Sequence, residues 1–358
     1  MSALIESLRA FVQFETISGN RAQKQACADW IATTFFSEFS AKLQRGVVND
    51  CPYILLENPD AQLLWFAHFD VVPGIPEQFS VRTEGRKAFG RGVKDMKGAC
   101  VPFLLAFQEE VRAGNTPPVS VLFTSDEEIA GQSIPTLIAE GLKPPAAFTP
   151  DTGSSLGIVT EHKAILWAEL TARGDSTHGA MPWKGENAVW LLADALERIH
   201  KALPAPASEK EWGMTVSPTS LKGSDTKNQT PATAVCGLDI RYPPERYSDA
   251  AEVLSVVQKS LPMNCDVTEV LSAPGLSTDP KHPMVQLIKK LADECTGREV
   301  PFIREHGGTD ARYFATAGIP AFLFGPDGGD LHGPNEWVSL DSLEQHHEMY
   351  RRLFEVLR

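Results

Sequence analysis

Histidines and carboxylates follow several apolar runs of the sequence, at positions from which they could serve one chemical site. Four runs, LLWFA, VSVLFTS, AAFTP and AFLF, lead into such residues: His68, Asp126–Glu128, Asp151 and His332. A fifth segment, GRGVKDMKG, places Asp95 in a glycine-rich loop just before an expected helix. Because sites in open α/β sheets form beyond the carboxyl ends of the strands, we expect these side chains to meet at one sheet edge.

Two imidazoles and three carboxylates of this set suit a divalent metal: His68, Asp95, Glu128, Asp151 and His332. Nitrogen and oxygen donors of these types bind zinc, cobalt or manganese. A single metal with five protein ligands has no open position, so we expect two metals that share Asp95. One then takes His68 and Asp151, and the other takes Glu128 and His332. Such a pair activates water and holds a substrate oxygen.

Two further carboxylates fit supporting roles at this site. Neighbours in an extended segment point apart, so Glu128 can bind metal while Glu127 acts as general base. Asp70 lies two residues beyond His68 and can accept the second ring N–H of that ligand, which fixes its tautomer. Taken alone, a His-x-Asp pair is structural and adjacent glutamates are a solvated surface pair. The joint occurrence at strand ends favours the metal site.

The elements that must position these residues alternate along the first part of the chain. Buried strands are expected at 63–67, 119–124 and 146–149, and a helix at 101–111, where Pro102 is tolerable only in the first turn. Strand and helix alternation predicts an α/β fold with a mostly parallel sheet and helices on both faces. A last helix is expected over 340–357, with His346 and His347 facing solvent.

The pattern changes between residues 164 and 276. Strands with one solvated face are expected at 164–172 and 235–242, and helices at 187–202 and 248–260. Apolar runs typical of buried elements return afterwards, and they predict a helix at 284–295 and a strand at 321–324. We therefore expect an α+β domain over 164–276, inserted into a larger domain made of 1–163 and 277–358.

The amino-acid composition indicates which classes of partner the protein is unsuited to bind. The 358 residues carry 33 basic and 46 acidic side chains, a net charge of −13, which argues against binding to nucleic acid or anionic membranes. No apolar run is long enough to cross a bilayer, and the N-terminus is typical of an amphipathic helix, not of a signal peptide. The six cysteines form no CxxC pair. We expect a cytoplasmic protein.

Eight segments resemble the co-catalytic zinc metallopeptidases that include succinyl-diaminopimelate desuccinylase, acetylornithine deacetylase, aminoacylase and carboxypeptidase G. They are HFDVVPG, GRGVKDMKGA, TSDEEIAG, TPDTG, GDSTHGAMPWKGENA, NQTPATAVCGLDIRY, GGTDAR and HGPNE. The resemblance implies the same five ligands and Glu127 as acid/base. One departure is TPDTG, where desuccinylases typically have Glu-Pro-Thr, so the resemblance does not specify a desuccinylase.

The resemblance also implies that the inserted domain is a lid and dimerisation domain. His178 would come from the partner's lid and stabilise the tetrahedral oxyanion; the alternative is a surface-loop histidine. Asn228 and Arg241 match lid positions that bind the substrate carboxylate and amide region.

Arg312, in GGTDAR, resembles a further carboxylate clamp, a role that suits a guanidinium. For both arginines a structural alternative stays open. Arg312 could pair with Asp310, and Arg241 with Asp239.

Together these expectations predict a homodimeric amide hydrolase with two divalent metals per chain. Zn²⁺ is the expected metal, and Co²⁺ and Mn²⁺ are the alternatives. Its substrate would be a small, carboxylate-bearing N-acylated amino acid. A dipeptidase or carboxypeptidase of the same family is the alternative within enzymes. A catalytically silent metal-binding scaffold is the alternative outside them.

Overall fold

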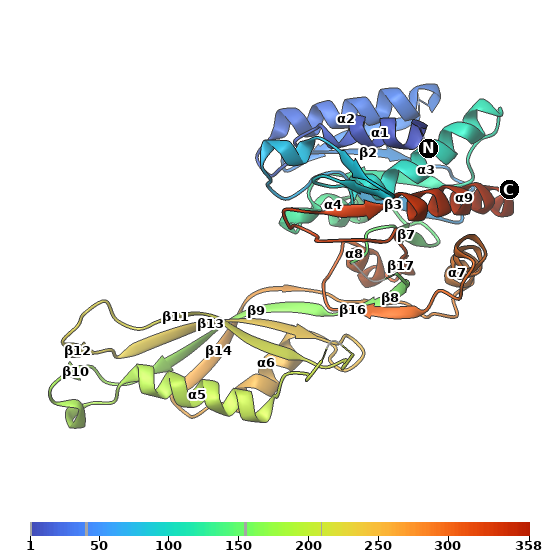
Figure 1. Ribbon diagram of the computed structural model, residues 1–358. Helices are drawn as coiled ribbons and strands as arrows, with labels where there is room; N and C mark the ends of the chain where they lie inside the picture. The colour runs from blue at the N-terminus through green and yellow to red at the C-terminus, as the bar shows by residue number, and fades with distance from the viewer. Residues whose placement is uncertain (1, 40–41, 154–155, 209) are drawn as a thin grey trace. The chain divides into compact units, whose positions relative to one another are not determined.

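A computed structural model describes residues 2–39, 42–153, 156–208 and 210–358 of the protein (Figure 1). The chain divides into two compact units. The first comprises Met1–Glu161, Thr278–Glu305 and Thr309–Arg358, and the second comprises His162–Ser277 and His306–Gly308. The short segment His306–Gly308 thus packs with the second unit, although it lies inside the last predicted stretch, 277–358.

A twisted sheet runs through the first unit in the order β1-β2-β6-β3-β7-β17-β8, with β16 beside β8. The four middle strands are parallel, and the outer pairings β1–β2, β2–β6 and β17–β8 are antiparallel. The strands are β1 (Leu43–Val48), β2 (Cys51–Leu56), β3 (Leu64–His68), β6 (Ser120–Thr124), β7 (Ala147–Thr149), β8 (Ile158–His162), β16 (Phe302–Glu305) and β17 (Ala321–Leu323).

Helices cover both faces of this sheet, because its middle strands are apolar on both sides. Every residue of β3 and β6 is buried. Trp65 stacks on Phe103 of α3 at 3.8 Å between ring centroids, whereas the next residue, Phe66, contacts Phe314 of α8 at 4.9 Å. The predicted α/β class with a mostly parallel central sheet is therefore confirmed. The helices are α1 (Ser2–Val12), α2 (Arg21–Phe35), α3 (Lys97–Arg112), α4 (Ser133–Ala139), α7 (Pro283–Thr296), α8 (Ala311–Thr316) and α9 (Leu340–Leu357).

Two expectations about these helices are wrong. Helix α3 begins at Lys97, so Pro102 lies in its second turn and not in its first. The proline there removes one helical hydrogen bond, to the carbonyl of Gly98 four residues earlier. His346 is 1% exposed and stacks on Phe324, because it lies on the face of α9 that packs against the sheet and not on the solvated face.

A small antiparallel sheet, which the sequence did not predict, lies at one side of the first unit. Its order is β18-β19-β5-β4, and it joins segments far apart in the chain. The strands are β4 (Arg82–Glu84), β5 (Lys87–Phe89), β18 (Gly328–Gly329) and β19 (Trp337–Ser339). The pairing of β5 with β19 holds the loop before α3 beside the loop 330–336.

The second unit is a four-stranded antiparallel sheet with two helices on one face (Figure 1). Leu166, Leu170, Leu238 and Ile240 are buried against the helices, while Trp167 is 46% exposed on the opposite face. This alternation is the one predicted for a sheet with one solvated face. The sheet order is β11-β13-β9-β14. The strands of this sheet are β9 (Ala164–Arg173), β11 (Thr215–Lys222), β13 (Thr233–Tyr242) and β14 (Cys265–Ala273), and the helices are α5 (Ala188–Ala202) and α6 (Ala250–Gln258). The second unit also contains β15 (Leu276–Ser277), which is not part of this sheet.

A separate two-stranded ribbon extends the second unit. It pairs β10 (Thr177–His178) with β12 (Gln229–Thr230) in antiparallel register. Across the described residues of both units, no helix combines the length and the apolarity needed to cross a membrane.

Candidate metal centre

The five candidate ligands lie at the ends of neighbouring elements of the first unit. His68 is the last residue of β3, and Asp151 comes two residues after the end of β7. Glu128 lies in the 3-10 turn Glu127–Ile129 that follows β6. Since β6, β3 and β7 are adjacent and parallel, their carboxyl ends bring these three side chains together.

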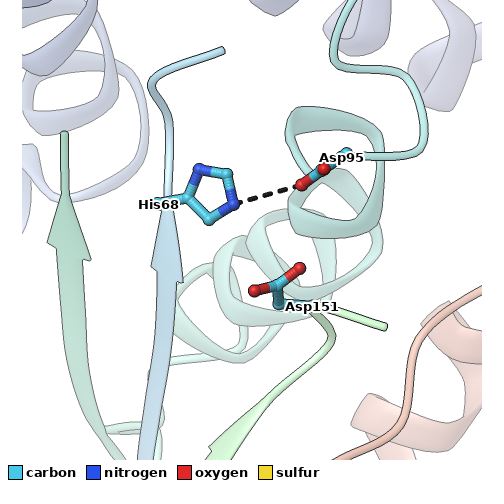
Figure 2. Close-up of side chains that lie close together, drawn as sticks. All are labelled: His68, Asp95 and Asp151. Carbon is cyan, nitrogen blue, oxygen red and sulfur yellow. Dashed lines mark ion pairs between the residues drawn. The ribbon is translucent and has the colours of Figure 1, made fainter. Parts of the chain in front are cut away.

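One ligand group consists of His68, Asp95 and Asp151, whose donor atoms lie within 4.8 Å of one another (Figure 2). The Nε2 atom of His68 is 3.2 Å from Oδ1 of Asp95. The Nδ1 atom faces the other way, 3.1 Å from the carbonyl oxygen of Asp70 and 3.4 Å from its Oδ1. Acceptors on that side hold the ring proton on Nδ1, so the Nε2 lone pair is directed at the group.

A second ligand group consists of Asp95, Glu128 and His332. Nε2 of His332 lies 3.0 Å from Oδ2 of Asp95 and 3.3 Å from Oε2 of Glu128. The two carboxylate oxygens of Asp95 therefore face different imidazoles, one in each group. This is the partition of the five residues predicted from the sequence, with Asp95 in the shared position.

Asp70 connects the first ligand group to the Glu127–Glu128 pair. It is 1% exposed, and its Oδ1 and Oδ2 accept the backbone N–H groups of Glu127 and Glu128 at 3.3 and 3.1 Å. One carboxylate thus orients an imidazole and also fixes the turn that carries both glutamates.

Three carboxylates lie close together around the two imidazoles of the centre. Burial, together with the nearby Asp95 carboxylate, raises the pKa of Asp151 to about 7. The hydrogen bond to Asp95 and the Glu128 carboxylate raise the pKa of His332 to about 10. Both shifts show that the negative charges of neighbouring carboxylates repel one another, so that protons bind to Asp151 and His332 more strongly than usual. A divalent cation neutralises such a cluster.

The residues present fit bound divalent metal. Two of their donor atoms, His68 Nε2 and Glu128 Oε1, are buried and have no hydrogen-bond partner among the described residues. His68 Nε2 faces Asp95 Oδ1 without hydrogen-bond geometry. Buried donor atoms that lack a hydrogen-bond partner are typical of ligands around a cation.

Glu127 lies beside the two groups and has a neighbour that sequence reasoning missed. Desolvation, and next the Asp310 carboxylate, raise the pKa of Glu127 well above its ordinary value. Asp310 is 4% exposed and belongs to GGTDAR, where the sequence indicated only a possible ion pair with Arg312. Its position in that segment, two residues before Arg312, was the signal in the sequence that could have found it.

Three predicted site residues, His178, Asn228 and Arg241, belong to the second unit. His178 is exposed on the β10–β12 ribbon, where its backbone pairs with Gln229. The N–H of Gly179 donates to the carbonyl of Asn228 at 2.8 Å. The ribbon therefore holds His178 and Asn228 near each other.

Both arginines make the ion pairs that were left open as alternatives. Arg241 donates from Nε and Nη2 to the two oxygens of Asp239, at 2.6 and 3.0 Å. Arg312 is 4% exposed, with Nη2 3.6 Å from Oδ1 of Asp310. Carboxylate binding by either arginine stays a prediction.

The sequence matches, over residues 64–356, the family described as peptidase family M20/M25/M40. The chain belongs to this family. Members of the M20/M25/M40 family are metal-dependent hydrolases of carbon–nitrogen bonds, and the two ligand groups agree with this activity. The protein is therefore an amide or peptide hydrolase.

Named relatives within the family differ in the substrates their names give. The chain is 26% identical to a succinyl-diaminopimelate desuccinylase of Marinobacter nauticus, over 81% of this chain and 82% of that one. It is also 26% identical to an Aspergillus terreus protein named "Probable carboxypeptidase", over 82% and 70%. A Staphylococcus aureus tripeptidase shares the fold, with a TM-score of 0.82, 17% identity, and coverage of 99% of this chain and 98% of that one.

Proposed function

We propose that the protein removes the acyl group from a small N-acylated amino acid, using two divalent metals, most suitably Zn²⁺. The observation that carries this proposal is the shared carboxylate. Oδ1 of Asp95 lies 3.2 Å from Nε2 of His68, and Oδ2 lies 3.0 Å from Nε2 of His332. A carboxylate with one oxygen in each ligand group suits a bridge between two metals.

The residues then divide the work. His68, Asp95 and Asp151 would hold one metal, and Asp95, Glu128 and His332 the other. When bound, the metals supply Lewis-acid polarisation of the amide carbonyl and lower the pKa of an attacking water.

Glu127 takes the proton from that water and later donates it to the leaving amine nitrogen. A carboxyl group whose pKa is raised by desolvation suits both transfers, because it holds the proton between the two steps. Asp70 keeps the ring proton of His68 on Nδ1. His178, Asn228 and Arg241 of the second unit, with Arg312 of the first, would bind the oxyanion and the carboxylate of the substrate.

The second unit would also form a homodimer. Two apolar side chains at the start of α5, Val189 and Trp190, are 43% and 75% exposed, and Leu221 near the end of the edge strand β11 is 67% exposed. Exposed apolar side chains on a helix and on an unpaired strand edge are typical of a protein interface. In the dimer, each chain would supply His178 to the other.

The test is a hydrolysis screen of the zinc-loaded protein against N-acetyl and N-succinyl amino acids and dipeptides. The proposal expects the highest kcat/KM on an N-acyl amino acid with a free carboxylate, and little on the matching amide without that carboxylate. No hydrolysis across the panel at full metal loading would contradict it and favour a binding or scaffold role.

A second candidate is a carboxypeptidase or dipeptidase, which the name of the Aspergillus terreus relative favours. The same screen separates the two, since the second candidate predicts the highest kcat/KM on the dipeptides.

A further inference from the structure

A buried ion pair, Arg91 with Glu336, lies behind the second ligand group and takes no part in the reaction proposed above. Arg91 is 3% exposed and Glu336 is 1% exposed, and Arg91 Nη1 donates to Glu336 Oε2 at 2.8 Å. A buried pair of this kind contributes little net stability compared with apolar side chains of the same volume. Its partners therefore indicate what it does.

The Glu336 carboxylate accepts hydrogen bonds from the loop that carries Asp95. Oε1 accepts the backbone N–H groups of Lys94 and Asp95, at 2.9 and 3.1 Å. Oε2 accepts the N–H of Gly92 at 3.0 Å in addition to the Arg91 guanidinium. Both oxygens thus have two donors each, and three of the four come from the backbone of one short loop.

The Arg91 guanidinium reaches the opposite loop, which carries His332. Its Nη2 lies 3.1 Å from the carbonyl oxygen of His332 and 3.3 Å from that of Gly333. His332 has φ of 61°, in the left-handed region that a non-glycine residue adopts at a cost. The carbonyl of a residue in this unfavourable conformation is therefore held directly by Arg91.

We propose that the Arg91–Glu336 pair is a positioning device for the second ligand group, which sets its metal affinity by fixing the loops of Asp95 and His332 against each other. The inference rests on the proposed two-metal function. It goes beyond that function by separating the two groups. The pair contacts the loops of two members of the second group, but only the shared Asp95 of the first.

Glu336→Gln is the first test variant. Gln keeps the size of the side chain but replaces one carboxylate oxygen by NH₂. The NH₂ group then faces two N–H donors that had hydrogen-bonded to that oxygen. The metal-free protein is titrated with Zn²⁺ against a competing chelator, and bound zinc is counted by elemental analysis. We expect one of the two equivalents, the one in the second ligand group, to bind about 10–100-fold more weakly, the usual effect of losing a hydrogen-bond partner behind a metal ligand. The other equivalent should weaken by less than about tenfold, because the first group depends on the pair only through the shared Asp95.

Arg91→Lys is the second test variant, and it guards against misfolding of the first. Lysine keeps a positive charge beside Glu336 but lacks the second nitrogen of the fork that reaches the His332 carbonyl. It should weaken the same equivalent. Glu84→Gln is the matched control, because Glu84 pairs with Arg82 on strand β4 of the adjoining small sheet and both side chains are exposed. It should leave both equivalents unchanged.

The outcomes separate this inference from the proposed function. Equal weakening of both equivalents, or no change in either, would show that the pair supports the fold and not the second group. A parent protein that binds a single equivalent would overturn the two-metal proposal and this inference together. A parent that binds two equivalents but hydrolyses nothing would overturn only the proposed function.

Discussion

Asp70 links three residues with different proposed tasks. Its carboxylate and carbonyl hold the ring of His68, and its two carboxylate oxygens accept the N–H groups of Glu127 and Glu128. In Asp70→Asn, the amide NH₂ faces at least one of these donors. We expect zinc affinity of the first ligand group to fall about 10–100-fold, with a lower kcat at saturating zinc. Zinc titration with parallel rate measurement checks this, and unchanged affinity would contradict it.

Glu127 offers the sharpest test of the chemistry. In Glu127→Gln the side chain keeps its size but transfers no proton, so kcat should fall by about 10²–10⁴-fold. Zinc content should match the parent because Glu127 is outside both ligand groups. Initial rates are compared with elemental analysis of the same samples. Turnover close to that of the parent with zinc bound would refute the role of Glu127 as base.

His346 predicts a pH dependence of stability that is independent of catalysis. Burial lowers its pKa to about 4 in the folded protein, against about 6.5 in the unfolded chain. Between these values the unfolded state binds the extra proton. The free energy of unfolding should therefore fall as the pH drops from 6.5 to 4, by at most about 1.4 kcal/mol per pH unit from this residue.

Urea unfolding of the metal-free protein across this range measures the effect. His346→Gln, which can still donate to the Ser342 carbonyl, is the comparison. The parent should lose stability faster than the variant as the pH falls. Parallel pH profiles would exclude His346 as the source.

Residue types and order were enough to propose the ligand groups, but not the residues behind them. His68 and Asp151 follow apolar strands, a pattern visible in the sequence. Glu336 acts through backbone N–H groups of a loop more than 240 residues away. Such a contact depends on tertiary structure and has no local sequence pattern. The pairing of Arg312 with Asp310 is different, because it is local: the sequence offered it as one of two alternatives, and the fold shows the ion pair.

Among the elements, strands that are apolar throughout were predicted well. β3, β6, β7 and β17 are fully buried, so hydrophobicity alone marks them. The strands of the small sheet were missed because they are two or three residues long, and all of β4 is exposed. Backbone pairing, not a side-chain pattern, defines them. The early start of α3 was missed because Pro102 suggested a helix boundary.

The junction between the Asp95 loop and α3 depends on a glycine. A Cβ atom on Gly98 would lie 2.0 Å from the carbonyl oxygen of Val93, which is backbone and cannot rotate away. Gly98→Ala should therefore displace the loop. We expect a loss of about 1–3 kcal/mol of stability and weaker zinc binding by both groups, since they share Asp95.

Gly114→Ala, just past the other end of α3, is the control. Its φ is 81° and nothing lies within 4 Å of a Cβ there, so it should cost only about 1–2 kcal/mol of backbone strain. Zinc affinity should stay at the parent value. Thermal unfolding and zinc titration measure both variants, and normal zinc binding by Gly98→Ala would contradict the argument.

For the whole molecule, net charge was a weak guide and the order of the motifs a strong one. The surplus of 13 acidic residues argued against nucleic acid and anionic membranes as partners but pointed to no site. The candidate ligands come from segments spread between residues 68 and 332, and the order of these segments along the chain pointed to one family. Assembly of these segments follows from the parallel sheet, whose crossovers bring distant strand ends together.

Exchange of His178 between subunits is testable by mixing. His178→Ala and Glu127→Gln chains should each be nearly inactive as homodimers. In a mixed dimer, the chain with intact Glu127 receives His178 from its partner, so one of two sites regains activity. Co-refolded or co-expressed chains are assayed against the separate variants. Activity no higher than their sum would show that His178 does not act across the dimer.

The candidate residues are divided between the two units of the chain, and this division bears on how the enzyme could diversify. The metal-ligand candidates and Glu127 all lie in the first unit, while His178, Asn228 and Arg241 lie within one continuous stretch, His162–Ser277. Substitutions or recombination confined to that stretch leave the ligand groups intact. On the proposed roles, substrate preference could therefore change within that stretch as long as His178 is kept, while the candidate metal ligands and Glu127 are inherited unchanged.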